Sequence, residues 1–309
     1  MFQSDLIYDV GMNNGDDTAF YLERGYRVVG IEADPVLAGS CAERFSSALS
    51  DGRLEIVNVA VAPTEGRQTF YVCEGKSEWS SFDISIASKF GRKCHAIEVE
   101  CRRFGDILGQ YGVPYYLKVD IEGCDRVCLD AITREEAPPY LSVEISGVDD
   151  LSVLRGLGYQ RFKIIRQNDH RQLRFEDFCT IACCLKVQLE KARRLRSVVG
   201  ACANVKRPIA LAVRGARGFF QRRAASEDSG GAAGARFPAG SSGPFAEETD
   251  GEWQSFEEAA LCWLGFQRLG KHRFGPVGSQ FWFDVHAALE SAPSFSSLGH
   301  ARAGAISWA

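Results

Sequence analysis

The chain has 309 residues, of which 45% are hydrophobic and 25% charged, which excludes a wholly disordered chain and a fibrous one. Its formal net charge is −4, so we expect no general binding to nucleic acid. No apolar run approaches the roughly 20 residues that span a bilayer, and the first residues lack a secretory pattern, so we expect a cytoplasmic protein.

Over the first 185 residues, strand-like and helix-like segments alternate. Strands are expected at 5–10, 27–31, 54–60, 115–120 and 140–145, and helices at 17–24, 36–49 and about 124–132. Strands separated by helices predict crossover connections, and therefore an α/β fold with a doubly wound, mostly parallel sheet covered on both faces. Segments 159–165 and 179–185 are expected to pair antiparallel at the end of this sheet.

A different pattern interrupts this alternation between the third and fourth strands. Residues 68–73 and 95–101 alternate with period two, and a serine-rich stretch lies between them. This pattern predicts a strand pair that carries a flap. Trp79, Ser80 and Ser81 are the flap residues expected to cover a bound acceptor, and a merely solvent-exposed loop is the alternative.

After residue 185 the composition changes, so we assign residues 1–185 to one domain. Residues 186–223 are rich in arginine and predict one or two basic helices, and residues 224–243 predict a flexible linker. The basic segment is interpreted as a solvated face, and contact with an anionic partner or a membrane surface is the alternative. The aromatic tail, residues 244–309, is expected to form an appendage that packs on the first domain.

The eleven cysteines form no C-x-x-C pair, and only five histidines accompany them. Structural zinc sites normally combine close pairs of such ligands. We therefore expect reduced, mostly buried thiols and no metal site.

The first expected strand leads into a tight turn, Asp9-Val10-Gly11-Met12-Asn13-Asn14-Gly15-Asp16-Asp17-Thr18. Glycine at 11 and 15 lets the backbone come close to a ligand. Glu32 ends the second strand, 21 residues after Gly11, where a carboxylate can accept the hydroxyls of a ribose. The turn and the spaced acid together predict a nucleoside pocket at the carboxyl edge of the sheet.

The residues of this turn favour S-adenosylmethionine as the nucleoside. In the dinucleotide fingerprint G-x-G-x-x-G, the second and third glycines would fall at Asn13 and Asp16. Asp16 and Asp17 also add negative charge where a pyrophosphate needs amide donors. Asp9 is placed to meet the amino-acid end of S-adenosylmethionine, directly or through water. An NAD(P)-dependent oxidoreductase is the alternative, and a non-catalytic nucleoside-binding interaction module is a third interpretation.

A second motif, Leu117-Lys118-Val119-Asp120-Ile121-Glu122-Gly123, follows on the fourth expected strand. Lys118 and Asp120 share one face of that strand. Because a buried lysine is costly unless it is paired, Glu144 on the fifth strand is its expected partner in a structural ion pair. Asp120 and Glu122 fall at the carboxyl end of the strand, where open sheets bind ligands. An ion-pair network with no catalytic role is the alternative.

Several motifs occur in a fixed order: Asp9-Val10-Gly11-x-Asn13-x-Gly15, Glu32-Ala33-Asp34-Pro35, Asn58-Val59-Ala60, Lys118-Val119-Asp120-Ile121-Glu122-Gly123 and Val143-Glu144-Ile145. Over residues 5 to 185 the chain thereby resembles the FkbM-type family of S-adenosylmethionine-dependent methyltransferases. The resemblance implies a class I, Rossmann-like methyltransferase fold and O-methylation of a sugar or secondary metabolite. One departure is Asp125, where the family usually has glutamate, and we expect it to change a contact at a helix start. Cofactor-binding residues are expected at Asp9, Gly11, Asn13, Asn14, Gly15, Glu32, Ala33, Asn58, Ala60 and Asp120.

Methyl transfer to a small hydroxylated acceptor needs a general base. The candidates are Asp120, Glu122 and His95, and Asp120 is preferred because it lies nearest the expected methyl position. Asp120, Glu122 and Glu144 could instead hold a divalent cation, which we do not expect. His286, two residues after Asp284, is a further candidate base, and simple packing of the tail is the favoured interpretation. The sequence does not decide the oligomeric state.

Overall fold

The computed structural model describes residues 2–174, 241–267 and 282–293 of the chain. The chain divides into two compact units, Met1–Leu173 with Pro238–Ala309, and Arg174–Phe237. The fold below is that of the first unit. The expected strand 179–185, the basic segment 186–223 and nearly all of the linker 224–243 lie outside the described residues.

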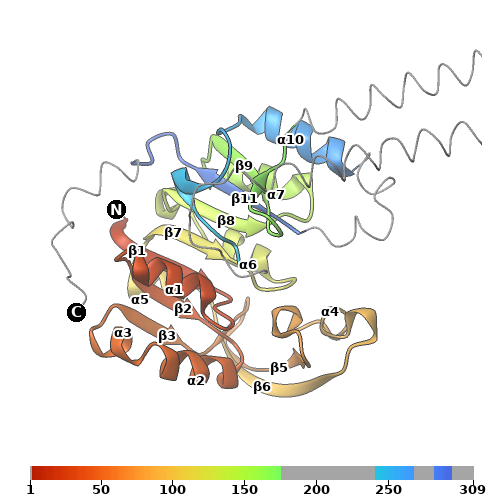
Figure 1. Cartoon of the computed structure of the whole chain (residues 1–309). Helices are drawn as coiled ribbons and strands as arrows, with labels where there is room; N and C mark the ends of the chain where they lie inside the picture. The colour runs from red at the N-terminus through yellow and green to blue at the C-terminus, as the bar shows by residue number, and fades with distance from the viewer. Residues whose placement is uncertain (1, 175–240, 268–281, 294–309) are drawn as a thin grey trace, which may run out of the picture. The chain divides into compact units, whose positions relative to one another are not determined.

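An eight-stranded sheet forms the centre of the first unit (Figure 1). Its strands are β1 Gln3–Val10, β2 Arg27–Ile31, β3 Leu54–Val57, β7 Pro114–Val119, β8 Tyr140–Glu144, β9 Arg161–Arg166, β10 Arg171–Gln172 and β11 Phe283–Ala288. Their spatial order is β10-β9-β11-β8-β7-β1-β2-β3. Strands β1, β2, β3, β7 and β8 pair in parallel, whereas β11 and β10 run antiparallel to their neighbours. This mostly parallel, doubly wound sheet confirms the expected fold class.

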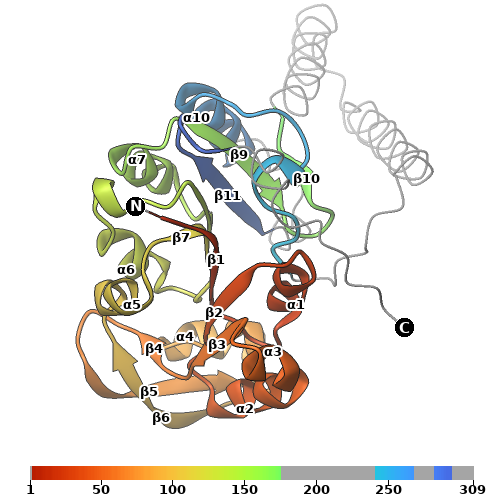
Figure 2. The same ribbon diagram turned by 90° about the vertical axis from the view of Figure 1, so that its left-hand side faces the viewer.

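Helices cover both faces of this sheet, with α1 on one face and α5, α6 and α7 on the other (Figure 2). The helices of residues 2–174 are α1 Asp16–Glu23, α2 Pro35–Arg44, α3 Ser46–Ser50, α4 Ile84–Ala87, α5 Phe104–Tyr111, α6 Asp125–Asp130 and α7 Val148–Gly156, and the 3-10 helix η3 spans Arg134–Glu136. The tail adds the 3-10 helix η4 Ala246–Glu248 and the helix α10 Phe256–Gly265. Within the described ranges, none of these helices has the length and hydropathy needed to cross a membrane.

The second helix begins and breaks for identifiable reasons. The Asp34 carboxylate accepts a hydrogen bond from the amide of Val36, and Pro35 occupies the first turn, a standard helix start. The helix expected over 36–49 is divided into α2 and α3 at Phe45, whose backbone is not helical. The Phe45 ring packs under the first turn, where a Cβ added at Gly15 would lie 2.5 Å from it.

A small second sheet lies beside the main one and confirms the expected strand pair. Its strands are β4 Ala60–Val61, β5 Gly66–Cys73 and β6 Cys94–Arg102, in the order β4-β6-β5 with β5 and β6 antiparallel. The single strand expected at 54–60 is wrong, because β3 ends at Val57 and Ala60 pairs with Cys101 of β6 instead. The flap between β5 and β6 contains η1 Ser77–Trp79, α4 and η2 Lys89–Gly91.

The tail contributes a strand to the interior of the main sheet. Strand β11 lies between β8 and β9, with Asp284 opposite both Glu144 and Ile165, and all six of its residues are buried. The sequence predicts an appendage that packs on the first domain, whereas in the described residues β11 of this tail is itself a strand of the main sheet. This arrangement is favourable because without β11 the backbones of β8 and β9 would face each other with unpaired donors and acceptors.

Candidate active site

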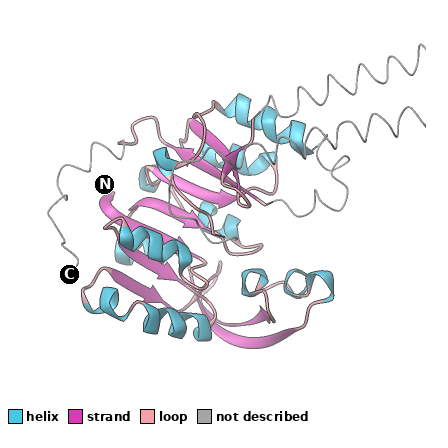
Figure 3. Ribbon diagram, in the orientation of Figure 1, coloured by secondary structure: helices cyan, strands magenta, loops and turns pink. Residues whose placement is uncertain are grey.

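A pocket opens among the loops that follow the carboxyl ends of β1, β2 and β7. Figure 3 draws these loops in pink and the strands in magenta. The pocket encloses about 980 Å³ of open space, including its mouth. Open α/β sheets bind ligands at this edge, so the pocket lies where the sequence places a nucleoside site.

Two loops meet at the base of the pocket. Gly11 has a φ of +82°, and a Cβ added there would lie 1.9 Å from the carbonyl oxygen of Asp120, so only glycine fits. Asn13 takes a positive φ of 49°, a conformation that asparagine tolerates better than most residues, which explains why this turn needs no second glycine. Gly11, Asn13 and Asn14 all line the pocket.

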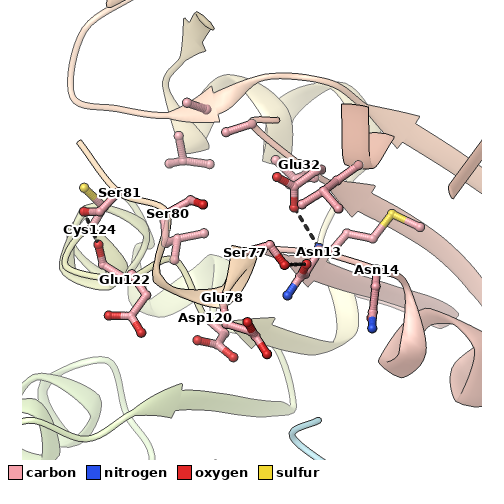
Figure 4. Close-up of a pocket in the computed structure, with 18 of the residues that line it drawn as sticks. Asn13, Asn14, Glu32, Ser77, Glu78, Ser80, Ser81, Asp120, Glu122 and Cys124 are labelled. Atoms are coloured by element: carbon pink, nitrogen blue, oxygen red, sulfur yellow. Dashed lines mark hydrogen bonds between the residues drawn. The ribbon is translucent and has the colours of Figure 1, made fainter. Parts of the chain in front are cut away.

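Glu32 lies in the wall of the pocket and is 8% exposed. Its Oε2 accepts a hydrogen bond from the backbone amide of Asn13 at 2.7 Å, and its Oε1 accepts one from that of Asp34 at 2.9 Å (Figure 4). Burial raises the pKa of Glu32 to about 7, although both amides oppose this change. Each carboxylate oxygen keeps a further lone pair, so the group can still accept ribose hydroxyls.

Asn58 supports this wall from outside the pocket. Its Nδ2 donates to the carbonyl oxygen of Glu32 at 2.7 Å and to that of Ala33 at 3.3 Å. Ala33 and Ala60 line the pocket, but Asn58 does not. We therefore reassign Asn58 from cofactor contact to a residue that positions the end of β2.

The expected ion pair of Lys118 with Glu144 is wrong. The Lys118 Nζ lies 2.9 Å from Asp9 Oδ1 and 3.2 Å from Asp17 Oδ2, and it also donates to the carbonyl oxygen of Gly11 at 3.2 Å. The reason is strand order, since β7 pairs with β1 and places Lys118 directly opposite Asp9. Burial alone would lower the pKa of Lys118, but Asp9 and Asp17 hold it well above its usual range.

Asp120 and Glu122 both line the pocket, but they differ in their partners. Glu122 accepts a hydrogen bond from Lys89 Nζ at 3.2 Å, whereas no hydrogen bond or ion pair from the described residues holds the Asp120 carboxylate. Burial raises the pKa of Asp120, the positive charge of Lys118 opposes this, and neighbouring carboxylates add to it. One of them is Glu78, which Figure 4 shows next to Asp120.

Glu144 lies outside the pocket lining, in a group of carboxylates along the same sheet edge. Burial, followed by the charges of Asp120, Glu122 and Asp284, raises the pKa of Glu144 to about 9. Asp125, where the sequence departs from the family pattern, accepts a hydrogen bond from the amide of Ile121 at 2.9 Å just before α6. In the described residues no three His, Cys, Asp or Glu side chains are grouped as a metal site requires.

The flap touches both pocket loops. Ser77 Oγ donates to Asn13 Oδ1 at 2.8 Å, and Ser81 Oγ donates to the carbonyl oxygen of Glu122 at 2.8 Å. Ser80 and Ser81 line the pocket. Trp79 does not, because its ring is buried among Phe90 and two cationic side chains.

Several expected site residues do not line the pocket. His95 is exposed on β6, with its Nδ1 3.9 Å from Glu74, so the structure removes it from the candidate bases. Asp9 is fully buried with Thr18 and Lys118 on its two oxygens, and Gly15 is covered by the Phe45 ring. Neither is positioned to touch a cofactor. The expectation for both is corrected to a role in shaping the first turn.

His286 is also not an oriented base. It is 1% exposed, and neither ring nitrogen has a hydrogen-bond partner among the described residues. Burial lowers the pKa of His286 to about 3. Asp284 accepts its hydrogen bond from Gln167 instead, at 2.8 Å.

Sequence reasoning missed several polar pocket residues as site residues. Ser77 and Glu78 belong to the serine-rich stretch that signalled the flap, and Asp17 belongs to the first turn, so each carried a detectable signal. Ser241 also lines the pocket. Nothing in the sequence near Ser241 predicts this, because its position depends on the return of the tail to α1.

Seven cysteines lie in the described residues and form no disulfide with one another, and five of them are buried: Cys41, Cys73, Cys101, Cys128 and Cys262 are buried, whereas Cys94 and Cys124 are partly exposed. Only Cys124 lies in the pocket wall. Burial raises its pKa, which keeps it protonated and poorly nucleophilic.

Comparison with known proteins extends the resemblance. The sequence model of the Methyltransferase FkbM domain matches residues 9–168, slightly more than half of the chain. No curated protein sequence matches it. Among solved structures, precorrin-6y C5,15-methyltransferase from Geobacter metallireducens GS-15 is similar at 15% identity and a TM-score of 0.30, over 53% of this chain and 70% of that chain. A TM-score this low carries no argument about function. The family match spans the loops that build the pocket, and the chain therefore belongs to the FkbM family of methyltransferases, with a class I, Rossmann-like fold.

Proposed function

We propose that the protein transfers a methyl group from S-adenosylmethionine to a hydroxyl group of a small, sugar-like acceptor that carries no negative charge. The observation that carries the proposal is the placement of two carboxylates in one pocket. Glu32 lies at the end of β2, and Asp120, which has no hydrogen-bond partner among the described residues, lies at the end of β7 (Figure 4). The first suits the ribose of the cofactor, and the second suits the proton of the acceptor.

The pocket residues fit this cofactor. Gly11 brings the backbone of the first turn close to the ligand space, and Glu32 offers carboxylate lone pairs there. Asp16 and Asp17, also in the lining, oppose a pyrophosphate and favour a ligand with positive charge. When bound, S-adenosylmethionine supplies an electrophilic methyl group on a cationic sulfur.

The charge of the lining supports a neutral or cationic acceptor. Among the described residues, one lysine lines the pocket together with six carboxylate side chains, namely Asp16, Asp17, Glu32, Glu78, Asp120 and Glu122. That lysine, Lys118, is already paired with two aspartates. The carboxylates would repel the negative charge of a phosphorylated or carboxylated acceptor, which would weaken its binding. The hydroxyls of Ser77, Ser80 and Ser81 offer hydrogen bonds to a polyhydroxy ligand.

Asp120 is the residue best placed to take the acceptor proton. Glu122 is engaged by Lys89, and His95 lies outside the pocket, whereas no contact from the described residues restrains Asp120. The pKa of Asp120 is raised towards neutral pH, and a general base works best when its pKa is near the working pH. Such a base contributes about 10²–10⁴-fold to a rate, and alignment of the reactants supplies most of the remainder.

Calorimetric titration tests the cofactor. We expect S-adenosylhomocysteine to bind and NADPH not to bind. Binding of NADPH alone would overturn the proposal in favour of an oxidoreductase. If S-adenosylhomocysteine binds but no labelled methyl group reaches any acceptor, the chain is a binding module.

Methyl transfer from labelled S-adenosylmethionine to matched neutral, amino and phosphorylated sugars tests the acceptor class. We expect product with the first two and little with the third. Asp120→Asn should reduce turnover by about 10²–10⁴-fold while S-adenosylhomocysteine still binds. Undiminished turnover of this variant would reject Asp120 as the base.

A further inference from the structure

Asp17, the second residue of α1, lines the pocket with one carboxylate oxygen that has no hydrogen-bond partner among the described residues. It is 6% exposed and lines the pocket. Its Oδ2 lies 3.2 Å from Lys118 Nζ and accepts a hydrogen bond from the backbone amide of Ser242 at 3.1 Å. Its Oδ1 has no hydrogen-bond partner among the described residues. A buried carboxylate oxygen left without a partner costs free energy, so this arrangement points to a ligand.

The neighbouring groups cannot satisfy this oxygen themselves. The three contacts of Lys118 Nζ, to Asp9, Asp17 Oδ2 and Gly11, match the three donors of an ammonium group. Asp9 uses one oxygen for Lys118 and the other for Thr18. Of the two aspartates that contact Lys118 directly, Asp17 is therefore the one that lines the pocket and keeps an oxygen without a partner among the described residues.

We propose that Asp17 Oδ1 accepts a hydrogen bond from the α-ammonium group of S-adenosylmethionine, and that Ser242 holds Asp17 in position from the tail. This inference rests on the proposed function and replaces Asp9 as the residue at the amino-acid end of the cofactor. Burial raises the pKa of Asp17 and Lys118 opposes this, so a second positive charge beside it is favourable. The tail lies outside residues 9–168, so it adds to the pocket something that the family match does not contain.

Other contacts fix the tail segment that carries Ser242. The ring of Phe245 stacks on Tyr116 with centroids 4.3 Å apart and an interplanar angle of 7°. Glu248 forms an ion pair with Arg24 at the end of α1, at 2.8 Å. The segment is thus held at both ends of α1, which keeps the Ser242 amide directed at Asp17.

The decisive experiment compares two probes that differ only at the amino-acid end. S-adenosylhomocysteine carries the α-amino group, and 5′-methylthioadenosine has the adenosine and the sulfur but no amino acid. We expect Asp17→Asn to weaken the binding of S-adenosylhomocysteine by about 10–100-fold, the range of one hydrogen bond to a charged group. The binding of 5′-methylthioadenosine should be unchanged. Asp34→Asn is the matched control, since Asp34 is equally buried, caps α2 and does not line the pocket, and asparagine also serves as a helix cap.

The tail contact is tested separately. Ser242→Pro removes the amide N–H that Asp17 accepts, whereas Ser242→Ala keeps it. We expect only the proline variant to lose part of the preference for S-adenosylhomocysteine over 5′-methylthioadenosine. Equal preference in both variants would overturn the positioning role of Ser242.

The outcomes separate this inference from the proposed function. If Asp17→Asn weakens the binding of both probes equally, or of neither probe, Asp17 does not bind the amino group. If the unaltered protein binds neither probe, the proposed cofactor itself fails. Should Asp17→Asn not fold, deaminated S-adenosylhomocysteine is titrated into the unaltered protein, and binding as tight as that of S-adenosylhomocysteine overturns the inference.

Discussion

Replacing Lys118 by methionine should destabilise the protein strongly. Lys118 is 3% exposed, and its ammonium group is the cation that contacts both Asp9 and Asp17. Methionine preserves much of the length of the side chain but leaves two buried carboxylates without that partner. Breaking a buried ion pair from one side costs about 3–5 kcal/mol, a large share of the roughly 5–15 kcal/mol that stabilises a folded domain.

Urea-induced unfolding at neutral pH measures this loss. Arg53→Met is the control, because it removes one cation from an exposed pair with Asp51 at 3.4 Å, and such pairs contribute about 0–1 kcal/mol. Adding Asp9→Asn to Lys118→Met should recover part of the loss, since one uncompensated charge is removed. A Lys118→Met protein as stable as the Arg53→Met control would refute the view that this lysine holds β7 to β1 and α1.

Two further predictions concern stability. The pKa of Glu144 is raised to about 9 in the folded protein, mainly by burial, so unfolding releases a proton at neutral pH. The free energy of unfolding should therefore fall as the pH rises from the ordinary pKa of a glutamate towards 9, by about 1.4 kcal/mol per pH unit. Glu144→Gln should remove this part of the slope, as measured by urea titrations at several pH values. Phe245→Ala should cost about 3–5 kcal/mol in the same assay, because Phe245 is 3% exposed and stacked on Tyr116.

Each of these two predictions has its own contrary result. Parallel pH profiles for Glu144→Gln and the unaltered protein would show that Glu144 titrates alike in the folded and unfolded states. Phe90→Ala is the comparison for Phe245, since Phe90 is an aromatic residue that is 81% exposed. A loss for Phe245→Ala no larger than for Phe90→Ala would mean that the tail does not support the core.

The parts of the fold that sequence reasoning predicts are those governed by local pattern. Strands β1, β2 and β7 are short apolar runs bounded by turn residues, and α2 starts at an aspartate–proline signal, so each follows from its own residues. The places of Gly11, Glu32 and Asp120 in the pocket lining were predictable for the same reason. Each falls at the end of a parallel strand, and such ends share one edge of the sheet.

The parts that were missed depend on which strands become neighbours. Lys118 pairs with Asp9 because β7 lies beside β1, a choice that the spacing along the chain does not reveal. Strand β11 reads as a half-polar segment, since Asp284 and His286 alternate with apolar residues, yet both side chains are buried in the sheet. Period-two alternation indicates a strand but does not say whether its polar face meets water.

The position of β11 explains why the tail contributes to the pocket. Because β11 fills the gap between β8 and β9, the chain must return to the sheet after residue 240, and the segment that precedes α10 crosses α1 on the way. The return places Ser241 in the pocket wall and the Ser242 amide on Asp17. The described parts of the tail therefore contribute both a strand of the sheet and part of the pocket wall, and we expect a variant that releases β11 to weaken both.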